Sequence, residues 1–232
     1  LLAMVDLADA TGHENSVLTP PPTRIAARLA EIILSGSFVQ PLAQTLALLL
    51  LAYAIACPLA VAVGLLMGRL RWVHDLLEPL LEMLRPLPKV ALLPPLMLLL
   101  GLDTAFKVTI VALGVFFPVV INTIQGARGV DRTLVDCART FGRGGGVILW
   151  SVILPAAAPM ILAGMRVGLG LALILVVLAE MLAGTGGLGY LIVDMQRSFR
   201  IVDMYAWIVL LALLGYGLNA VFVALERRFV VW

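Results

Sequence analysis

The sequence predicts an all-α protein, a bundle of helices that crosses a membrane several times. Of its 232 residues, 62% are hydrophobic and 13% are charged, and the mean hydropathy is +1.08. A soluble domain carries about 25% charged residues and roughly 45–50% apolar ones. This composition disfavours water-soluble enzymes and disordered chains as classes, and it indicates a lipid bilayer as the main solvent of the protein.

The balance of charges and the small number of metal-ligating residues disfavour two further classes, nucleic-acid-binding proteins and metalloproteins. The 16 Lys and Arg residues against 14 Asp and Glu residues leave a net charge of +2. A protein that binds a nucleic-acid backbone needs a far larger positive excess, so no nucleic-acid partner is expected. Two cysteines cannot build a disulfide framework, and two histidines offer little material for a metal centre.

Three uncharged runs are long enough for a membrane crossing, which needs about 20 apolar residues. They are residues 40–68, 108–127 and 204–225. Pro58 lies inside the first run and predicts a kink in its helix. We therefore expect these three segments to be spanning helices.

Two further crossings are less regular. The apolar run 90–102 is too short for a straight crossing and contains Pro94 and Pro95, so we expect a broken helix that borrows residues from its flanks. Further along, residues 147–165 are uncharged and long enough for a crossing, but residues 167–182 would then be too short for a further one. We favour a single crossing at about 160–183, which gives five crossings in total.

Basic residues are distributed unevenly between the two sides of these crossings. The loops 69–89 and 127–160 and the tail 225–232 together hold ten Lys and Arg residues, whereas the segments on the opposite side hold five. Arg166, near the end of a predicted crossing, is the sixteenth. Cytoplasmic loops carry the excess of basic residues, so the loop 127–160 is expected in the cytoplasm.

This orientation divides the chain into three parts. Residues 1–38 form an external segment, residues 39–228 form the transmembrane domain, and residues 229–232 form a cytoplasmic tail. The external segment lacks the pattern of a cleaved secretion signal, and the chain begins with Leu1 rather than Met. We therefore expect that a further crossing precedes Leu1, so that the parent protein has six.

The loop 127–160 is predicted to contain a short amphipathic helix, because its apolar residues recur at helical spacing. The apolar stripe consists of Leu134, Val135, Ala138 and Phe141, and the opposite face of Arg132, Asp136 and Arg139. Gly142 stands where a helix end prefers a left-handed residue. A second apolar segment then ends at Leu154 and Pro155. The helix either lies in the lipid interface or offers its apolar stripe to a partner.

The spacing in this loop resembles a motif of the permease subunits of ATP-binding-cassette (ABC) importers. The motif has the form E-A-A, three residues, G, nine residues, I-x-L-P. The sequence has Asp136-Cys137-Ala138, then Gly142, then Val152-Ile153-Leu154-Pro155, and both gaps match. Asp replaces Glu and keeps the charge, Cys replaces Ala and keeps the small size, and Val replaces Ile conservatively.

Two further stretches resemble the nitrate, sulfonate and taurine importer permeases. Residues 82–102 are similar to the proline-rich third helix of that group, and residues 164–190 to its fifth helix and the loop after it. The likeness covers roughly residues 18–228. It implies the type I ABC-importer permease fold, usually with six helices, and it places residues 147–155 in the cytoplasmic loop. It therefore favours the crossing at 160–183.

The resemblance also implies partners. A dimer of ATPase subunits would dock on the loop, a second permease copy would form a homodimer with the first, and a periplasmic binding protein would deliver a small anion at the bacterial inner membrane. The residues expected to contact the ATPase are Arg132, Leu134, Val135, Asp136, Cys137, Ala138, Arg139, Phe141, Gly142, Leu154 and Pro155. The sequence contains no phosphate-binding G-x-x-x-x-G-K-[ST] loop. We therefore expect ATP and Mg²⁺ on the ATPase chains, and no enzymatic activity or cofactor in this one.

Polar and charged residues at membrane depth are candidates for the translocation pathway. These candidates are Asn122, Arg166 and Glu180. On an ideal helix Arg166 and Glu180 lie about 21 Å apart along the axis, so they cannot pair with each other. Glu180 either lies near the external mouth of the pathway and Arg166 near its cytoplasmic gate, or each pairs with a neighbouring helix. An ion-coupled secondary transporter that uses these two residues is the alternative function.

Overall fold

The computed structural model describes residues 20–229, and the regular elements within that range are all helices. The expected all-α bundle is confirmed. Residues 1–19 and 230–232 lie outside the described part of the chain, so the first half of the predicted external segment and most of the predicted tail are not covered.

The helices follow one another through short connections. In chain order they are α2 (Pro22–Leu34), α3 (Val39–Arg69), α4 (Arg71–Leu84), a 3₁₀ turn (Lys89–Leu92), α5 (Leu93–Leu100), α6 (Thr104–Arg128), α7 (Arg132–Thr140), α8 (Gly145–Ile148), a π-helical turn (Leu149–Ile153), α9 (Leu154–Ala183), α10 (Leu188–Arg197) and α11 (Ile201–Phe229).

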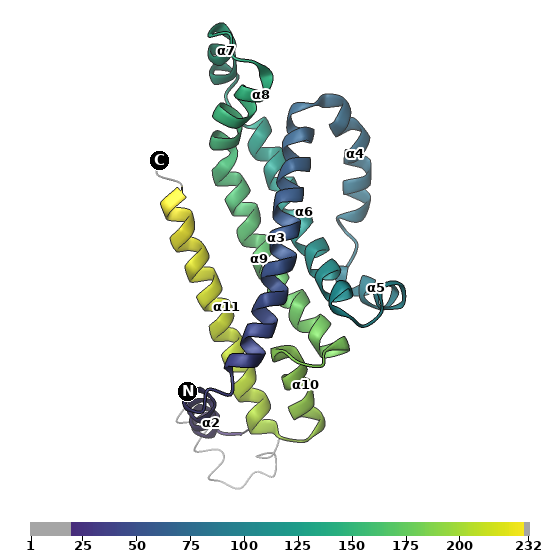
Figure 1. The fold of residues 1–232 in the computed structure, drawn as a ribbon, viewed down its shortest axis with the longest axis vertical. Coiled ribbons are helices and arrows are strands. Elements are labelled where there is room, and N and C mark those ends of the chain that lie inside the picture. Colours follow the sequence, from purple (N-terminus) through teal and green to yellow (C-terminus); the bar gives the residue numbers. More distant parts are fainter. Residues whose placement is uncertain (1–19, 230–232) are drawn as a thin grey trace.

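Three long helices, α3, α6 and α9, form the core of the bundle (Figure 1). Small residues let these helices approach closely. Gly64 of α3 lies against Thr123 of α6, and Gly164 of α9 lies against Asn122 of α6. Phe106, near the start of α6, is fully buried in this core. The close packing fixes the three helices relative to one another, and the cavities that concern function lie against them.

Four helical stretches are long and apolar enough to cross a membrane, and a fifth crossing results if one bent pair counts as a single span. That pair is Arg71–Leu84 and Lys89–Leu100, with a bend of 88° between its halves. The break expected in this stretch is therefore present, and its two halves make a fifth crossing if they form one span, with α4 as the flank that the crossing borrows. Residues 71–84, which the distribution of basic residues assigned to a cytoplasmic loop, instead form a helix that lies beside α3 (Figure 1).

The helix that ends at Ala183 begins much earlier than expected. It runs continuously over 39 residues from Gly145, so the prediction that an apolar segment stops at Leu154 and Pro155 is wrong. Pro155 has no N–H for a helical hydrogen bond and would normally break the ladder. Here the π-helical turn Leu149–Ile153 precedes it, and this local widening lets the helix pass the proline. The expectation of one crossing in this stretch, rather than two, agrees with the single continuous helix.

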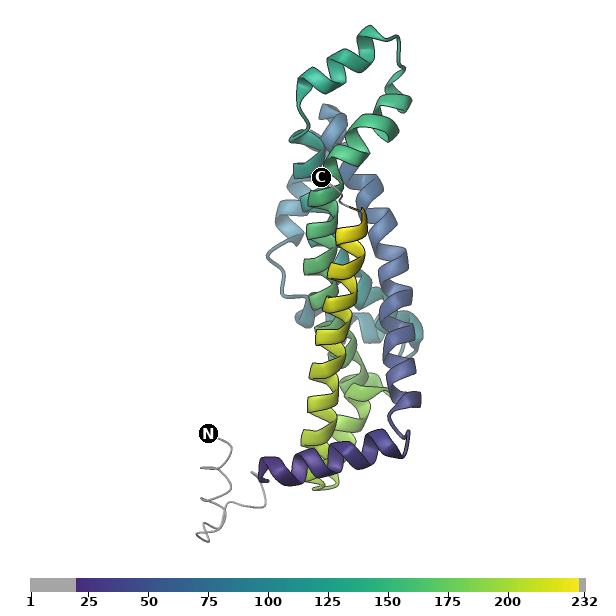
Figure 2. The same cartoon turned by 90° about the vertical axis from the view of Figure 1, so that its left-hand side faces the viewer.

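The two ends of the molecule differ in structure. At one end α7 and the first turns of the helix that begins at Gly145 project beyond the other long helices (Figure 1). At the other end α10 packs against α9 and α11, and α2 lies across the end of the bundle (Figure 2). An ion pair between Arg28 of α2 and Asp203 of α11 and the burial of Ile32 hold α2 in this position.

Candidate functional site

The end of the molecule that carries α7 contains the residues of the sequence motif. Asp131 caps the helix, because its carboxylate accepts a hydrogen bond of 2.9 Å from the backbone N–H of Thr133. This hydrogen bond lowers the pKa of Asp131 below its ordinary value. At the other end of the helix, Gly142 has a φ of +70°, the left-handed conformation that its position predicted.

The apolar stripe of α7 splits between two directions. Val135 and Ala138 pack inward, on a cluster that includes Leu65 of α3 and Ile148 of α8. Phe141, which follows the helix, is 83% exposed. The prediction of one continuous stripe waiting for a partner is therefore wrong in this respect: half of it is already used within the chain. The inward half attaches α7 to α3 and α8.

The outward surface of α7 remains open in this chain. Leu134 is 52% exposed, Cys137 is exposed, and Asp136 forms an exposed ion pair of 3.2 Å with Arg139. Arg132 is also exposed, whereas Leu154 and Pro155 are half-buried inside the continuous helix. Of the residues expected to contact a partner, those on the outer surface of α7 are thus accessible.

A basic groove lies at the base of α7. Its volume is about 740 Å³, and one acidic residue, Asp136, lies among its lining residues. The arginines that line it come from α3, α4, α6 and α7 and are Arg69, Arg71, Arg128, Arg132 and Arg139. Three of them, Arg69, Arg71 and Arg128, were not expected to belong to this site. The groove gives this end of the molecule a strong positive charge.

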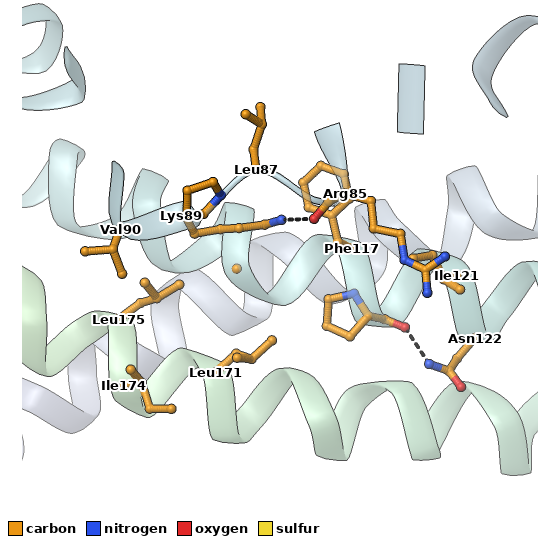
Figure 3. A pocket seen from close by; sticks show the side chains of 13 residues that line it. Arg85, Leu87, Lys89, Val90, Phe117, Ile121, Asn122, Leu171, Ile174 and Leu175 are labelled. Atoms are coloured by element: carbon orange, nitrogen blue, oxygen red, sulfur yellow. Dashed lines mark hydrogen bonds between the residues drawn. The ribbon is translucent and has the colours of Figure 1, made fainter. Parts of the chain in front are cut away.

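A central cavity of about 500 Å³ lies where the broken crossing faces α6 and α9 (Figure 3). Apolar side chains such as Phe117 and Leu171 make up most of its lining, and two cations, Arg85 and Lys89, enter it from the break. The Lys89 ammonium donates a hydrogen bond of 2.7 Å to the carbonyl oxygen of Arg85 and lies 4.5 Å from the centre of the Phe117 ring. Within residues 20–229, no carboxylate is among the residues that line this cavity.

Asn122 is the one predicted pathway residue that lines the central cavity. Its side-chain amide donates a hydrogen bond of 2.8 Å to the carbonyl oxygen of Pro118 on the same helix (Figure 3). Arg85 and Lys89 were missed by sequence reasoning. The available signal was their position, since they stand on either side of Pro86 and Pro88 at the break in an apolar stretch.

The two charged pathway candidates are far from each other and each has a different partner. Arg166 on α9 forms an ion pair with Glu226 on α11. Glu180 is almost completely buried, at 1% exposure. The hydroxyl of Thr45 on α3 contacts its two carboxylate oxygens at 2.9 and 3.0 Å, and the backbone N–H of Gly189 donates to it at 2.9 Å.

Thr45 connects this carboxylate to the loop that follows α9. Its hydroxyl oxygen also accepts a hydrogen bond of 2.9 Å from the backbone N–H of Leu188. Gly187 in the loop has a φ of +94°, and a Cβ atom there would collide with the Glu180 carboxylate. The network therefore joins α3, α9 and the start of α10 through one buried charge.

Comparison with known proteins identifies the family. Residues 58–231 match the model of the family described as "Binding-protein-dependent transport system inner membrane component". The putative aliphatic sulfonates transport permease protein SsuC of Bacillus subtilis is 33% identical over 232 residues, which cover 100% of this chain and 84% of that protein. The taurine transport system permease protein TauC of Escherichia coli is 31% identical over 92% of this chain and 79% of its own length.

Solved structures support the fold. A chain of the MetNI methionine ABC transporter in an inward-facing conformation superposes with a TM-score of 0.69 and 18% identity, over 80% of this chain and 92% of that one. A chain of an amino acid ABC transporter gives a TM-score of 0.67. The helical bundle, the loop motif and these similarities agree, and the chain belongs to the inner membrane components of binding-protein-dependent transport systems, as a permease subunit of an ABC importer.

Proposed function

We propose that this permease moves a small anion, of the sulfonate, taurine or nitrate kind, across a bacterial inner membrane by alternating access. The observation that carries the proposal is the central cavity, where Arg85 and Lys89 are the charged lining residues. An anion that enters this largely apolar space would find two cations and no competing carboxylate in the lining. The names of the sulfonate and taurine permeases to which the chain is similar point to the same class of solute.

The energy for transport would come from a pair of ATPase subunits that dock on α7. Its exposed residues, with Leu134 and Phe141 as apolar contacts, supply an attachment surface, and the basic groove beside them favours an acidic partner surface. Val135 and Ala138 pack on the same cluster as Leu65 of α3. A push on α7 would therefore be transmitted to α3 and to the helix that begins at Gly145. A second permease copy would complete the pathway, and a periplasmic binding protein would deliver the solute.

The ion-coupled alternative has weaker support. It needs Arg166 and Glu180 to bind and release an ion during transport. Arg166 is paired with Glu226, and Glu180 is committed to Thr45 and Gly189. Both charges thus have structural partners that explain their presence.

The proposal is tested by ATP-driven uptake of radiolabelled methanesulfonate, taurine and nitrate into proteoliposomes that contain the assembled transporter. Replacing both cavity cations in the double variant Arg85→Gln/Lys89→Gln is expected to lower uptake of the transported anion about tenfold or more, because charge-assisted hydrogen bonds to the solute are lost. Arg24→Gln is the matched control, since Arg24 is an exposed cation on α2, away from the cavity. Unchanged uptake in the double variant would contradict the proposal, and so would uptake that an uncoupler abolishes but ATP depletion does not.

A further inference from the structure

The chain contains two lysines, and each lines a different cavity. Lys89 belongs to the central cavity. Lys107, one turn into α6, lines a second cavity of about 310 Å³. This outer cavity lies between the first half of α3, the start of α6 and the end of α9. Figure 1 shows that these parts of the helices lie away from α7. Its polar lining residues are Gln44, Thr104, Lys107, Glu180 and Thr185.

Lys107 is buried without a partner among the described residues. It is 9% exposed, and within residues 20–229 its ammonium group has neither a hydrogen bond nor an ion pair. Glu180 lines the same cavity, but its oxygens accept hydrogen bonds from Thr45 and Gly189 and it forms no ion pair with Lys107. A buried ammonium group is costly unless a negative or hydrogen-bonding group satisfies it. The Lys107 ammonium group therefore still requires a hydrogen-bond acceptor, which a bound anion would supply.

The N-terminus of α6 also favours a negative charge in this cavity. Asp103 occupies the N-cap position but makes no side-chain hydrogen bond to the first turn. The uncapped backbone N–H groups of a helix N-terminus favour a negative charge nearby. Thr104, the first residue of this turn, lines the outer cavity together with Lys107. The N-terminus of α6 and the Lys107 ammonium group thus both favour an anionic ligand.

We propose that the outer cavity is a second binding site for the anionic head group of the solute, with the Lys107 ammonium as its charged ligand. The site would receive the anion before it reaches the central cavity, and in this respect the inference rests on the proposed function. Glu180 limits the charge of the ligand, because its carboxylate lines the same cavity and repels additional negative charge. A monovalent head group such as a sulfonate or nitrate is therefore preferred over a divalent one such as sulfate.

The test is calorimetric titration of the assembled, detergent-solubilised transporter with methanesulfonate in the absence of ATP. Lys107→Gln is expected to weaken the binding about tenfold to a hundredfold, in line with the loss of a charge-assisted hydrogen bond. Lys107→Arg keeps the charge and is expected to retain most of the affinity. Arg24→Gln, which removes an exposed charge from α2, is expected to bind as the unmodified protein does.

A second measurement needs no variant. Titration of the unmodified transporter with sulfate is expected to give weaker binding than titration with methanesulfonate. Equal or tighter binding of sulfate would overturn the proposed selectivity, and unchanged methanesulfonate affinity in Lys107→Gln would overturn the site. Because binding is measured without ATP and uptake with it, these failures differ from a failure of the proposed function, which appears as uptake that is insensitive to Arg85→Gln/Lys89→Gln.

Discussion

Glu180 shows how one buried side chain can organise a whole end of the molecule. Its carboxylate is 1% exposed and accepts hydrogen bonds from a side chain of α3 and from the backbone after α9. A buried carboxylate is tolerated only when such partners satisfy it. The Thr45 hydroxyl is the shared partner, because it donates to Glu180 and accepts from Leu188.

Thr45→Ala is therefore expected to lower the free energy of unfolding by about 1–3 kcal/mol, the cost of leaving buried polar groups without a partner. Thr45→Ser keeps the hydroxyl and is the matched control, with an expected loss well below that of the alanine variant. Thermal unfolding of the detergent-solubilised permease measures both. Equal stabilities of the alanine and serine variants would show that the hydroxyl does not hold this network together.

The partners of the charged residues could not be predicted from the sequence. Thr45 and Glu180 are 135 positions apart, and Arg166 and Glu226 are 60 positions apart. Helical spacing identifies which residues share a face of one helix, but it carries no information on which helix lies opposite. The sequence therefore allowed the conclusion that Arg166 and Glu180 do not pair with each other, and it left their actual partners open.

Helix α7 has an inward side that packs on α3 and α8 and an exposed outward side. Phe141→Ala is expected to weaken binding to the ATPase subunits about tenfold or more without changing the unfolding temperature, because an exposed aromatic side chain is a typical anchor of an interface. The measurement is co-purification of the ATPase with the permease, supported by titration of one against the other. ATPase binding that tolerates this substitution would argue against the outward side as the docking surface.

Val135→Ala is expected to act in the opposite way. Val135 packs on the cluster that joins α7 to α3 and α8, so its truncation is expected to cost about 1 kcal/mol of stability through lost apolar burial. Contacts with the ATPase itself would remain. Uptake per ATP hydrolysed is expected to fall, since α7 is then less firmly attached to the spanning helices. An unchanged coupling ratio in this variant would contradict the proposed route of transmission.

The role of the N-cap of α7 can be tested with two variants of Asp131. Asp131→Ala removes the acceptor for the backbone N–H of Thr133 and is expected to loosen the first turn of the helix. Asp131→Ser restores an acceptor and is expected to behave nearly as the unmodified protein. Hydrogen exchange of the α7 amides distinguishes the two. Equal protection in both variants would mean that the cap is not what holds this turn.

The sequence predicted most of the long elements, and its errors have local physical causes. Uncharged runs identified α3, α6 and α11 because lipid requires about 20 apolar residues in succession. The start of the helix over 145–183 was misplaced, since Pro155 suggests an end that the π-helical turn avoids. The helix over 71–84 was assigned to a loop because its basic and acidic residues mask an apolar face, from which Trp72 remains exposed.

Three candidate sites lie along one helical bundle. Helix α7 lies at one end and α10 at the other (Figure 1). The central cavity lies at the break between α4 and α5, and the Glu180 network joins α3, α9 and the start of α10. The helix Gly145–Ala183 connects all three, because it starts next to α7, lines the central cavity and ends beside Glu180. A displacement of α7 can therefore reach the central cavity and the Glu180 network through one continuous helix.

The two native cysteines can report whether the ATPase covers this end of the permease. Cys137 is exposed on α7, and Cys57 is buried in α3 as an internal control. Maleimide labelling of Cys137 is expected to slow at least about tenfold when the permease is assembled with its ATPase subunits, as expected for a residue at the core of an interface from which solvent is excluded, while Cys57 stays unlabelled in both states. Labelling of Cys137 at the same rate in the free permease and in the assembled transporter would contradict the account.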